Sequence, residues 1–330
     1  MKVLVTGGCG FIGSEVVRVA LEQGHEVVNL DKLTYAGNPA NVADVADDPR
    51  YAFIKGDIAD PDIAAQAVDG VEVVINLAAE SHVDRSLHNP TEFIETDVVG
   101  TATLIMAARE AGVRRFVQVS TDEVYGSIPK GAFKETDPIQ PSSPYSASKA
   151  GGDLQALAIH HTFGYDIVIT RGSNTYGPRQ YPEKLIPLFV TNALDGLALP
   201  VYGDGQQVRD WIHVRDHAEG IWHAMENGEA GQVYNVGGGN EWPNLEITER
   251  ILAHTGASHD LITYVEDRPG HDRRYALDTT KLRGMGWAPK VDFDDGLAST
   301  VEWYRDNRAW WEPIKSGEYA EWYSVNYGER

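Results

Sequence analysis

Short apolar runs alternate with longer amphipathic segments through the first half of the chain. The runs that predict buried strands lie at residues 2–5, 26–30, 51–55, 71–76 and 115–120. Helices are expected up to about residue 23, over about 61–68 and 91–111, and from 144 to about 163. This alternation predicts an α/β fold, a Rossmann-type doubly wound parallel sheet that binds ligands at the carboxyl ends of its strands.

Charge and cysteine content narrow the possible partners. The chain has 28 Lys and Arg against 49 Asp and Glu, a formal net charge of -21, which disfavours nucleic acid and anionic membranes. The acidic residues are spread along the chain, and Lys is scarce beside Arg, which resembles proteins from salt-rich cytoplasm. Cys9 is the single cysteine, no apolar run is long enough to span a membrane, and no apolar leader opens the chain. We therefore expect a soluble cytoplasmic protein.

A glycine-rich loop joins the first predicted strand to the first helix. Its G-x-x-G-x-x-G spacing allows a tight turn, a close approach to a pyrophosphate and close packing of helix on strand. The next strand ends at Asp31, near the spacing expected of a carboxylate that bonds the adenosine ribose. Asp31 would repel a 2'-phosphate and so favours NAD over NADP, although Lys32 beside it keeps NADP open. The loop residues expected at the dinucleotide are Gly7, Gly10, Phe11, Ile12 and Gly13.

Two later strand ends extend the predicted cofactor site. Asp57 and Ile58 follow the third strand and could hold the adenine by a hydrogen bond and an apolar contact. The segment that follows the fourth strand has small residues that would let the nicotinamide half lie against backbone. Each segment could instead be an ordinary loop. The residues expected at the cofactor from the fourth strand end are Leu77, Ala78, Ala79 and Ser81.

Two adjacent carboxylates stand where the fifth predicted strand ends. Asp122 and Glu123 follow the hydroxyl of Thr121 in the stretch from Ser120 to Gly126. Such a pair suits chemistry that delivers a proton at one atom and removes one at its neighbour. A solvated acidic turn is the alternative in so acidic a chain.

Tyr145 and Lys149 lie four residues apart on the helix predicted after them. Ser143 is expected to cap this helix and Pro144 to be its first residue. An ammonium beside a phenol stabilises the phenolate, so we expect a lowered pKa that lets Tyr145 take a proton from a sugar hydroxyl. An exposed Tyr and Lys pair would have no such role.

These motifs together resemble the extended short-chain dehydrogenase/reductase superfamily. More narrowly, nearly the whole chain is similar to the dTDP-glucose 4,6-dehydratases, which open deoxysugar pathways such as that to rhamnose. Related epimerases are expected to carry small or neutral residues at the positions of Asp122 and Glu123, and related decarboxylases keep only the glutamate. The pair therefore favours elimination of water. The segments that carry the resemblance, beyond the glycine loop and the Tyr145/Lys149 pair, are 78–86, 121–126, 181–187, 208–211 and 268–274.

The resemblance implies one bound NAD that is recycled within each turnover. Tyr145 would take the proton of the sugar 4-hydroxyl, with Lys149 holding the phenolate and the nicotinamide ribose and Thr121 bonding the 4-oxygen. Glu123 would remove the C5 proton while a protonated Asp122 gives its proton to the departing 6-hydroxyl. Glu123 would later reprotonate C5. The product would be a 4-keto-6-deoxy sugar nucleotide.

Beyond about Arg171 the chain becomes more irregular and richer in Pro, Gly and aromatic residues, as expected of a smaller substrate lobe. We expect residues 1–171 to form an NAD-binding Rossmann domain, to which later segments return, and residues 172–330 to form a smaller α/β lobe for the sugar nucleotide. Thr175 stands where many relatives have asparagine. Further cofactor contacts are expected from Leu33, Thr34, Thr96 and Thr175. Substrate contacts are expected from Ser81, Thr121, Asn174, Lys184, Leu185, Tyr202, Arg209, Asn244, Arg268 and His271.

Two other features have simpler explanations. His213 and His217 have helical metal-ligand spacing, but the first is expected on a strand and the helix near Asp216, so no metal site is predicted. The aromatic residues at 303, 304, 310 and 311 indicate a packed C-terminal helix. Helices 91–111 and 144–163 have apolar positions on more than one face, so we expect a homodimer through a helix bundle, as in the family.

Three functions remain open from sequence. The first is the dehydratase, a carbon–oxygen lyase acting on a nucleoside diphosphate glucose. The second is another NAD-dependent nucleotide-sugar enzyme, a 4,6-dehydratase for another base, a 4-epimerase or a decarboxylase. The third is a non-catalytic dinucleotide-binding regulatory protein, which would have no need to keep all of Tyr145, Lys149, Asp122 and Glu123.

Overall fold

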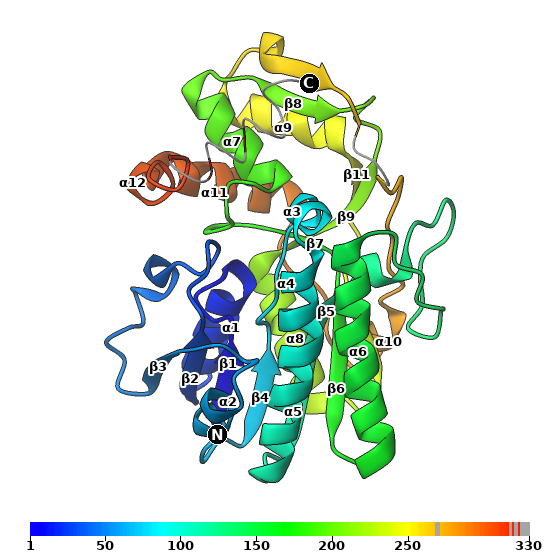
Figure 1. Cartoon of the computed structure of the whole chain (residues 1–330). Coiled ribbons are helices and arrows are strands. Elements are labelled where there is room, and N and C mark those ends of the chain that lie inside the picture. Colours follow the sequence, from blue (N-terminus) through cyan, green and yellow to red (C-terminus); the bar gives the residue numbers. More distant parts are fainter. Residues whose placement is uncertain (268–270, 317–318, 320–322, 324–330) are drawn as a thin grey trace.

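A seven-stranded parallel sheet forms the centre of the molecule in the computed structural model, which describes residues 1–267, 271–316, 319 and 323 (Figure 1). The strand order is β10-β6-β5-β4-β1-β2-β3. The chain proceeds outward from β1 in one direction and from β4 in the other, so the order reverses between these two neighbours. Such a reversal opens a crevice at the carboxyl ends of the strands. The predicted Rossmann-type α/β fold is confirmed.

The strands of the central sheet occupy β1 (Lys2–Thr6), β2 (Glu26–Asp31), β3 (Tyr51–Lys55), β4 (Val73–Asn76), β5 (Arg115–Thr121), β6 (Ile167–Gly172) and β10 (Val233–Val236). The helices around it are α1 (Phe11–Glu22), α2 (Pro61–Ala67), α3 (Val83–His88), α4 (Pro90–Ile94), α5 (Thr101–Glu110), α6 (Pro144–Phe163), α8 (Val214–Asn227) and α10 (Thr280–Arg283).

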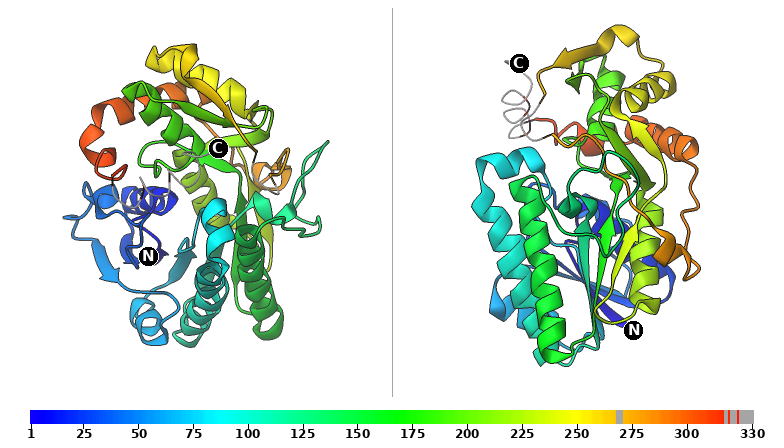
Figure 2. Two further views of the ribbon diagram at one scale, coloured as in Figure 1. Left: turned by 45° about the horizontal axis from the view of Figure 1, so that its top comes forward. Right: turned by 90° about the vertical axis from the view of Figure 1, so that its right-hand side faces the viewer.

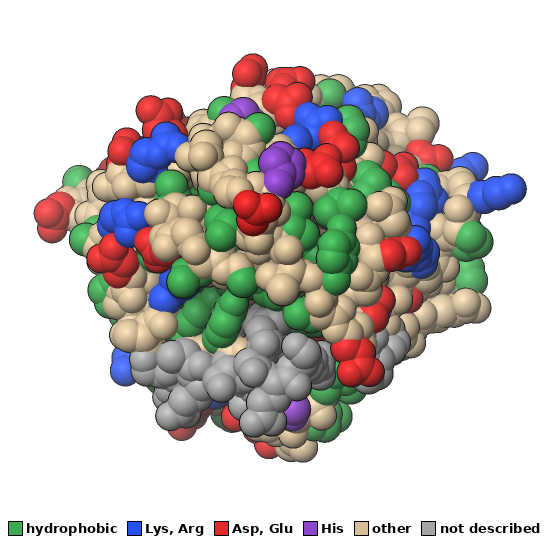
Figure 3. Space-filling model, turned by 90° about the horizontal axis from the view of Figure 1, so that it is seen from above, with side chains coloured by type: hydrophobic (Ala, Val, Ile, Leu, Met, Phe, Trp, Pro, Cys, Tyr) green, Lys and Arg blue, Asp and Glu red, His purple; other side chains and the backbone are tan. Residues whose placement is uncertain are grey.

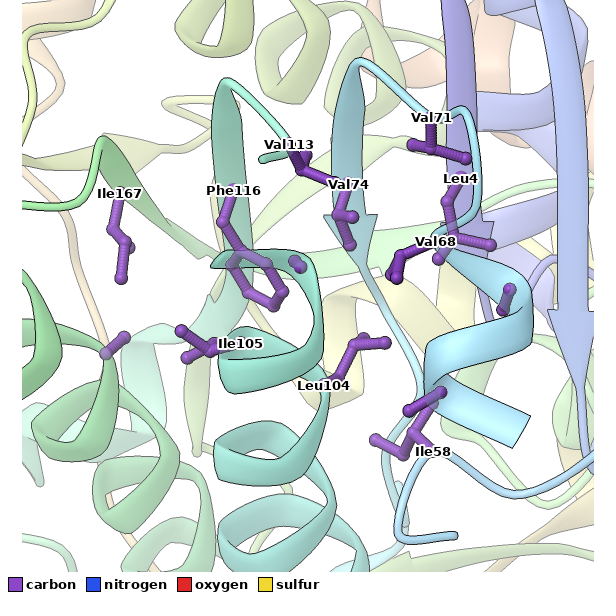
Figure 4. Packing of buried hydrophobic residues seen from close by; sticks show 14 of the residues in the cluster. Leu4, Ile58, Val68, Val71, Val74, Leu104, Ile105, Val113, Phe116 and Ile167 are labelled. Carbon is purple, nitrogen blue, oxygen red and sulfur yellow. The ribbon is translucent and has the colours of Figure 1, made fainter. Parts of the chain in front are cut away.

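Apolar side chains cover both faces of this sheet. On one face, Leu4, Val74 and Phe116 of the strands pack against Leu104 and other side chains of α2, α5 and α6 (Figure 4). On the other face, a second buried cluster joins the sheet to α1 and α8. Runs of apolar residues in the strands supply these contacts, as is usual in a sheet covered on both sides. These two layers fix the positions of the strand ends.

The helix predicted from Pro144 forms as expected. The Ser143 hydroxyl accepts the amide of Ser146, while the Ser146 hydroxyl accepts the amide of Ser143, so the two serines form a capping box. The helix ends at Gly164, whose φ of 66° is the left-handed conformation favoured by glycine. Sequence-local signals therefore place the whole of α6.

Two predicted helices differ in detail from the structure. The helix expected over 91–111 consists of α4, a π-helical turn (Glu95–Gly100) and α5. α8 begins at Val214, two residues before the expected start, because the His213 side chain accepts the Arg215 amide (3.3 Å) and caps the helix. His213 thus has a structural role, whereas His217 lies inside α8.

The smaller lobe packs over the carboxyl edge of the central sheet (Figures 1 and 2). A buried cluster that includes Tyr304 and Trp311 joins its helices, so the aromatic C-terminal segment is packed as predicted. β10 and α8 lie beyond residue 171 and belong to the central layer. The lobe contains β7 (Asn174–Tyr176), β8 (Leu199–Tyr202), β9 (Val208–His213), β11 (Glu241–Pro243), β12 (Ile262–Val265), α7 (Leu185–Asp195), α9 (Asn244–Thr255), α11 (Phe293–Asp306) and α12 (Arg308–Trp311).

Acidic side chains are prominent on the surface. On the face formed by the smaller lobe, Asp and Glu are interspersed with Lys and Arg (Figure 3). None of the helices in the described part of the chain is both long enough and apolar enough to cross a membrane.

Candidate active site

A cleft of about 300 Å³ lies where the central sheet meets the smaller lobe. The carboxyl ends of β1, β2, β4, β5 and β6 form one wall, and residues that follow β6 and β7 form the other. The cleft brings together all five expected catalytic residues, Thr121, Asp122, Glu123, Tyr145 and Lys149. It also contains the expected cofactor residues Gly7, Gly10, Phe11, Ile12, Gly13, Asp31, Lys32, Thr34, Asp57, Ile58, Leu77, Ala78, Ala79, Ser81, Thr96 and Thr175.

The glycine loop is shaped by close backbone packing. Gly7 has a φ of 65°, and a Cβ added at Gly13 would lie 2.1 Å from the Gly7 carbonyl oxygen. α1 begins directly after Gly10, without a side-chain cap and without an acidic residue in its first turn. Amides at a helix start have no partner within the helix, and the helix dipole is positive there. The loop therefore suits the diphosphate of a dinucleotide.

Asp31 is held rigidly at the end of β2. Its carboxylate accepts the backbone amides of Cys9 (2.9 Å) and Leu33 (2.8 Å). Burial raises the pKa of Asp31, and these two bonds oppose that rise. Leu33 contributes this amide, but it is not among the residues that line the cleft. Lys32 is ion-paired with Asp57 at 2.7 Å, so the charge that could have received a 2'-phosphate is already engaged.

The loop after β4 is fixed from β1. The Thr6 hydroxyl accepts the amides of Leu77 and Ala78, both at 3.1 Å. On the facing wall, the Thr175 hydroxyl contacts Nδ1 of His217 at 2.7 Å. Burial lowers the pKa of His217 to about 4, so this ring is neutral at pH 7. The residues present fit a bound dinucleotide from its adenosine end to its nicotinamide end.

The acidic pair follows directly from the end of β5. The Thr121 hydroxyl donates to Oδ1 of Asp122 and accepts the Glu123 amide, both at 3.2 Å, and starts a 3-10 turn (Asp122–Tyr125). Oδ2 of Asp122 is buried and has no hydrogen-bond partner within the described residues. Burial, followed by the charges of Glu123 and Asp210, raises the pKa of Asp122 well above its usual value. Its surroundings therefore favour the protonated form of Asp122 over the carboxylate.

Tyr145 and Lys149 face the same cleft from α6. The Lys149 ammonium donates to the Val119 carbonyl at 3.1 Å. Burial and the charges of Glu123 and Asp97 raise the pKa of Tyr145 well above 10, while a hydrogen bond with Thr121 lowers it. The expected lowering of the Tyr145 pKa is therefore wrong for the protein chain by itself, because burial next to carboxylates outweighs the nearby ammonium.

A second cleft of about 150 Å³ adjoins the first in the smaller lobe. Glu123, Asn174 and Lys184 line both clefts. The side-chain oxygens of Asn174 and Asn244 are buried, with no hydrogen-bond partner within the described residues. Arg209 lies over the Tyr275 ring, with 4.4 Å from its guanidinium carbon to the ring centroid. The other expected substrate residues on this cleft are Leu185, Tyr202, Arg209, Asn244 and His271, and Arg268 lies outside the described residues.

The comparisons with known proteins agree with this arrangement. The family model described as GDP-mannose 4,6 dehydratase matches residues 4–300. The chain belongs to this family. A dTDP-glucose 4,6-dehydratase of Streptomyces niveus is 54% identical over 327 residues, 97% of either chain. The low-salt glycan biosynthesis protein Agl12 of Haloferax volcanii is 50% identical over 92% of this chain and 98% of that protein.

A solved dehydratase structure has the same fold. DesIV, the dTDP-glucose 4,6-dehydratase of Streptomyces venezuelae, was crystallised with NAD and TYD bound. Its TM-score is 0.94 at 54% identity, covering 96% of this chain and all of DesIV. The resemblance to nucleotide-sugar 4,6-dehydratases inferred from the motifs is thereby confirmed, and the NAD bound to DesIV agrees with the predicted cofactor.

Several site residues of this family member were not predicted from its sequence. Burial raises the pKa of Glu80 to about 7 and that of Asp97 to about 6, and the Asp97 carboxylate accepts the Ser148 hydroxyl at 2.6 Å. Glu80 stands in one of the quoted segments, so that segment could have indicated it. Trp310 and Arg179 also line the cofactor cleft, and no motif indicated either residue. Within the described residues, no group of three or more His, Cys, Asp or Glu could hold a metal ion.

Proposed function

We propose that this protein is a dTDP-glucose 4,6-dehydratase, converting dTDP-glucose to dTDP-4-dehydro-6-deoxyglucose and water. The observation that carries the proposal is the buried Asp122 carboxyl, whose Oδ2 has no partner within the described residues, beside Glu123 in a cleft that also contains Tyr145 and Lys149. An epimerase needs no acid to expel a hydroxyl group. The identity to characterised dehydratases supports the same reaction.

Each catalytic side chain has one proton to hold or move. Tyr145 takes the proton of the sugar 4-hydroxyl, and Thr121 bonds the 4-oxygen. When bound, NAD supplies a positively charged two-electron acceptor for C4 and returns the same electrons at C6. Lys149 would orient the phenol and the nicotinamide ribose. The Lys149 ammonium and the positively charged nicotinamide would both stabilise the Tyr145 phenolate, which offsets the burial that opposes its formation.

Elimination follows from the acidity of C5 next to a C4 ketone. Glu123 removes the C5 proton, and Asp122 gives its own proton to the 6-oxygen, so the C6–O bond breaks and water leaves. Glu123 then returns a proton to C5. Burial and the charges of Glu123 and Asp210 raise the pKa of Asp122, which favours the proton-carrying form that this step needs, and the burial of Asp122 limits the access of solvent to that proton.

The second cleft is proposed to hold the nucleotide. Lys184 and Arg209 line it and suit the diphosphate of the substrate. The side-chain oxygens of Asn174 and Asn244 have no hydrogen-bond partner among the described residues. Tyr202, Leu185 and His271 also line this cleft. This cleft is about half the volume of the first. Glu123 lines both clefts, so the sugar is proposed to lie at their junction, between the nucleobase and the nicotinamide.

We also propose a homodimer that works in the cytoplasm. Ile94, Val99 and Leu154 are 52%, 49% and 56% exposed, on α4, the π-helical turn and α6, which pack side by side (Figure 1). A second copy of the chain would cover these side chains in a helix bundle. The cytoplasmic location is supported by a single buried thiol, Cys9, in a chain without disulfides.

The test is to incubate the purified protein, without added cofactor, with thymidine, uridine and cytidine diphosphate glucoses and, separately, with a nucleoside diphosphate uronic acid. We expect a product lighter by one water with the thymidine substrate, identified as the 4-keto-6-deoxy sugar by mass and NMR. A product of unchanged mass would indicate an epimerase, and loss of carbon dioxide from a uronic acid substrate would indicate a decarboxylase. A protein that binds NAD and converts none of these would be a regulatory protein.

A further inference from the structure

Arg179 is a cation of the cofactor cleft that has no carboxylate closer than 4.0 Å among the described residues. It follows β7 and has a φ of 70°, a left-handed conformation that is rare for a residue with a Cβ. Its neighbour Gln180 is anchored on both sides: the Gln180 side chain donates to the Thr175 carbonyl (2.8 Å), and the Gln180 carbonyl accepts the Tyr304 hydroxyl. Local strain of this kind persists where the surroundings impose it, commonly at ligand sites.

The guanidinium of Arg179 makes no hydrogen bond to any residue that the structure describes. Its nearest carboxylate is Asp44, at 4.0 Å. Asp44 is already taken by Arg18, which contacts both of its carboxylate oxygens, at 2.6 and 2.8 Å. Arg179 nevertheless keeps a side-chain exposure of only 25%. A largely buried cation without a close partner has lost hydration that an anionic ligand would replace.

Arg179 lies in the cleft where the diphosphate of a dinucleotide is expected. It lines the same cleft as Gly10 and Gly13 at the start of α1, from the facing wall. Nearby, the Trp310 ring nitrogen donates to Oδ1 of Asn41 (3.0 Å), and the Asn41 amide donates to the Cys9 carbonyl in the glycine loop (2.9 Å). The smaller lobe therefore reaches across to the loop at this point, and Arg179 comes from that lobe.

Arginine is suited to such a contact. Its planar guanidinium bonds two phosphate oxygens at once and stays charged at any working pH. In a chain of net charge -21, a fixed cation opposite the helix start also offsets the repulsion between the protein and the two negative phosphates. Lys32 is not available for this purpose because it is paired with Asp57.

We propose that the Arg179 guanidinium binds the diphosphate of NAD from the side opposite the glycine loop and slows release of the cofactor between turnovers. This inference rests on the proposed function, because it takes NAD to occupy the cleft. It adds a cofactor-retaining contact that comes from the smaller lobe. The contact would keep the cofactor in place while it is alternately reduced and oxidised.

The test measures release of NAD from the holoenzyme. Protein purified with its NAD is mixed with an excess of isotopically labelled NAD, and the bound fraction is followed by mass after rapid gel filtration. We expect Arg179→Met to release NAD tenfold to a hundredfold faster, or about 1.4 to 2.8 kcal/mol of lost binding energy, and Arg179→Lys to fall between. Arg305→Met removes one surface charge from α11 and is expected to exchange at the wild-type rate.

Three results would overturn the inference. They are an unchanged release rate in Arg179→Met, equal acceleration in Arg305→Met, and acceleration accompanied by a lower thermal midpoint in protein stripped of NAD, which would indicate a folding defect. Rising salt should speed release from the wild type more than from Arg179→Met.

With saturating NAD, Arg179→Met is expected to form the 4-keto-6-deoxy product. If neither wild type nor variant forms it, the proposed reaction fails, while the release rates still decide the role of Arg179.

Discussion

Replacing Asp122 by asparagine separates the two halves of the proposed reaction. The amide has nearly the same shape and no charge, and it cannot give a proton to the 6-hydroxyl. The proposed role as acid requires a protonated and therefore neutral Asp122, and burial favours that form by raising its pKa well above 3.8. Asp122→Asn therefore leaves the charge of the cleft unchanged and removes only the acid.

The size of the effect follows from the role assigned to Asp122. A positioned general acid contributes about 10²- to 10⁴-fold in rate, so product formation should fall by that factor, or by about 2.7 to 5.5 kcal/mol of barrier. Oxidation at C4 is spared because Tyr145, Lys149 and Thr121 are intact. A single turnover with dTDP-glucose should therefore accumulate reduced cofactor, seen by its near-ultraviolet absorbance, ahead of any product.

Stability provides an independent control for the same variant. A carboxyl whose folded pKa is raised stabilises the fold fully only below its unfolded pKa, and that stability is lost as pH rises, by at most about 1.4 kcal/mol per pH unit. Asp122→Asn should therefore be at least as stable as the wild type at neutral and alkaline pH. Glu249→Gln, on the exposed side of α9, serves as the matched carboxyl-to-amide control. Product formation by Asp122→Asn at the wild-type rate, without accumulation of reduced cofactor, would refute the role given to Asp122.

The remaining predictions concern other parts of the account. Tyr145→Phe should stop C4 oxidation, so that no reduced cofactor appears in a single turnover; its appearance at the wild-type rate would exclude Tyr145 as the base. The pKa of Asp97 is raised to about 6, so its contribution to stability is lost as pH rises from about 4 through 6, and Asp97→Asn should flatten the fall in thermal midpoint over that interval; an unchanged pH profile would contradict this. Leu154→Glu should convert a dimer to a monomer in light scattering, whereas Glu110→Gln on α5 should not, and a wild-type monomer would end the dimer proposal. The acidic composition predicts activity that rises with potassium chloride toward molar concentrations; activity that peaks in low salt would refute the salt adaptation.

Local patterns were enough to predict much of the fold. The β-strands and their order of alternation with helices follow from apolar runs that must be covered on both faces, and α6 follows from Ser143, Pro144 and Gly164. The π-helical turn between α4 and α5 could not be predicted in this way. It lies where Gly151 and Gly152 of α6 approach Val98 and the Asp97 carbonyl closely, which is a contact between distant segments.

The residues of the candidate site could likewise be predicted only in part. Residues that follow strand ends, such as Asp31 and Asp122, are brought together by the parallel sheet itself, and sequence spacing indicates them. Arg179 and Trp310 reach the cofactor cleft from the smaller lobe, and the bond between Trp310 and Asn41 spans 269 residues. The pKa of Tyr145 was predicted in the wrong direction because burial and the two nearby carboxylates depend on tertiary packing.

The central claim is that one bound cofactor takes hydride from C4 and returns it to C6 of the same sugar. The direct measurement uses dTDP-glucose that carries deuterium at C4, incubated with the protein without added NAD, and locates the label in the product by NMR. The account predicts deuterium on the C6 methyl group. Loss of the label to solvent, or its retention at C4, would contradict the account.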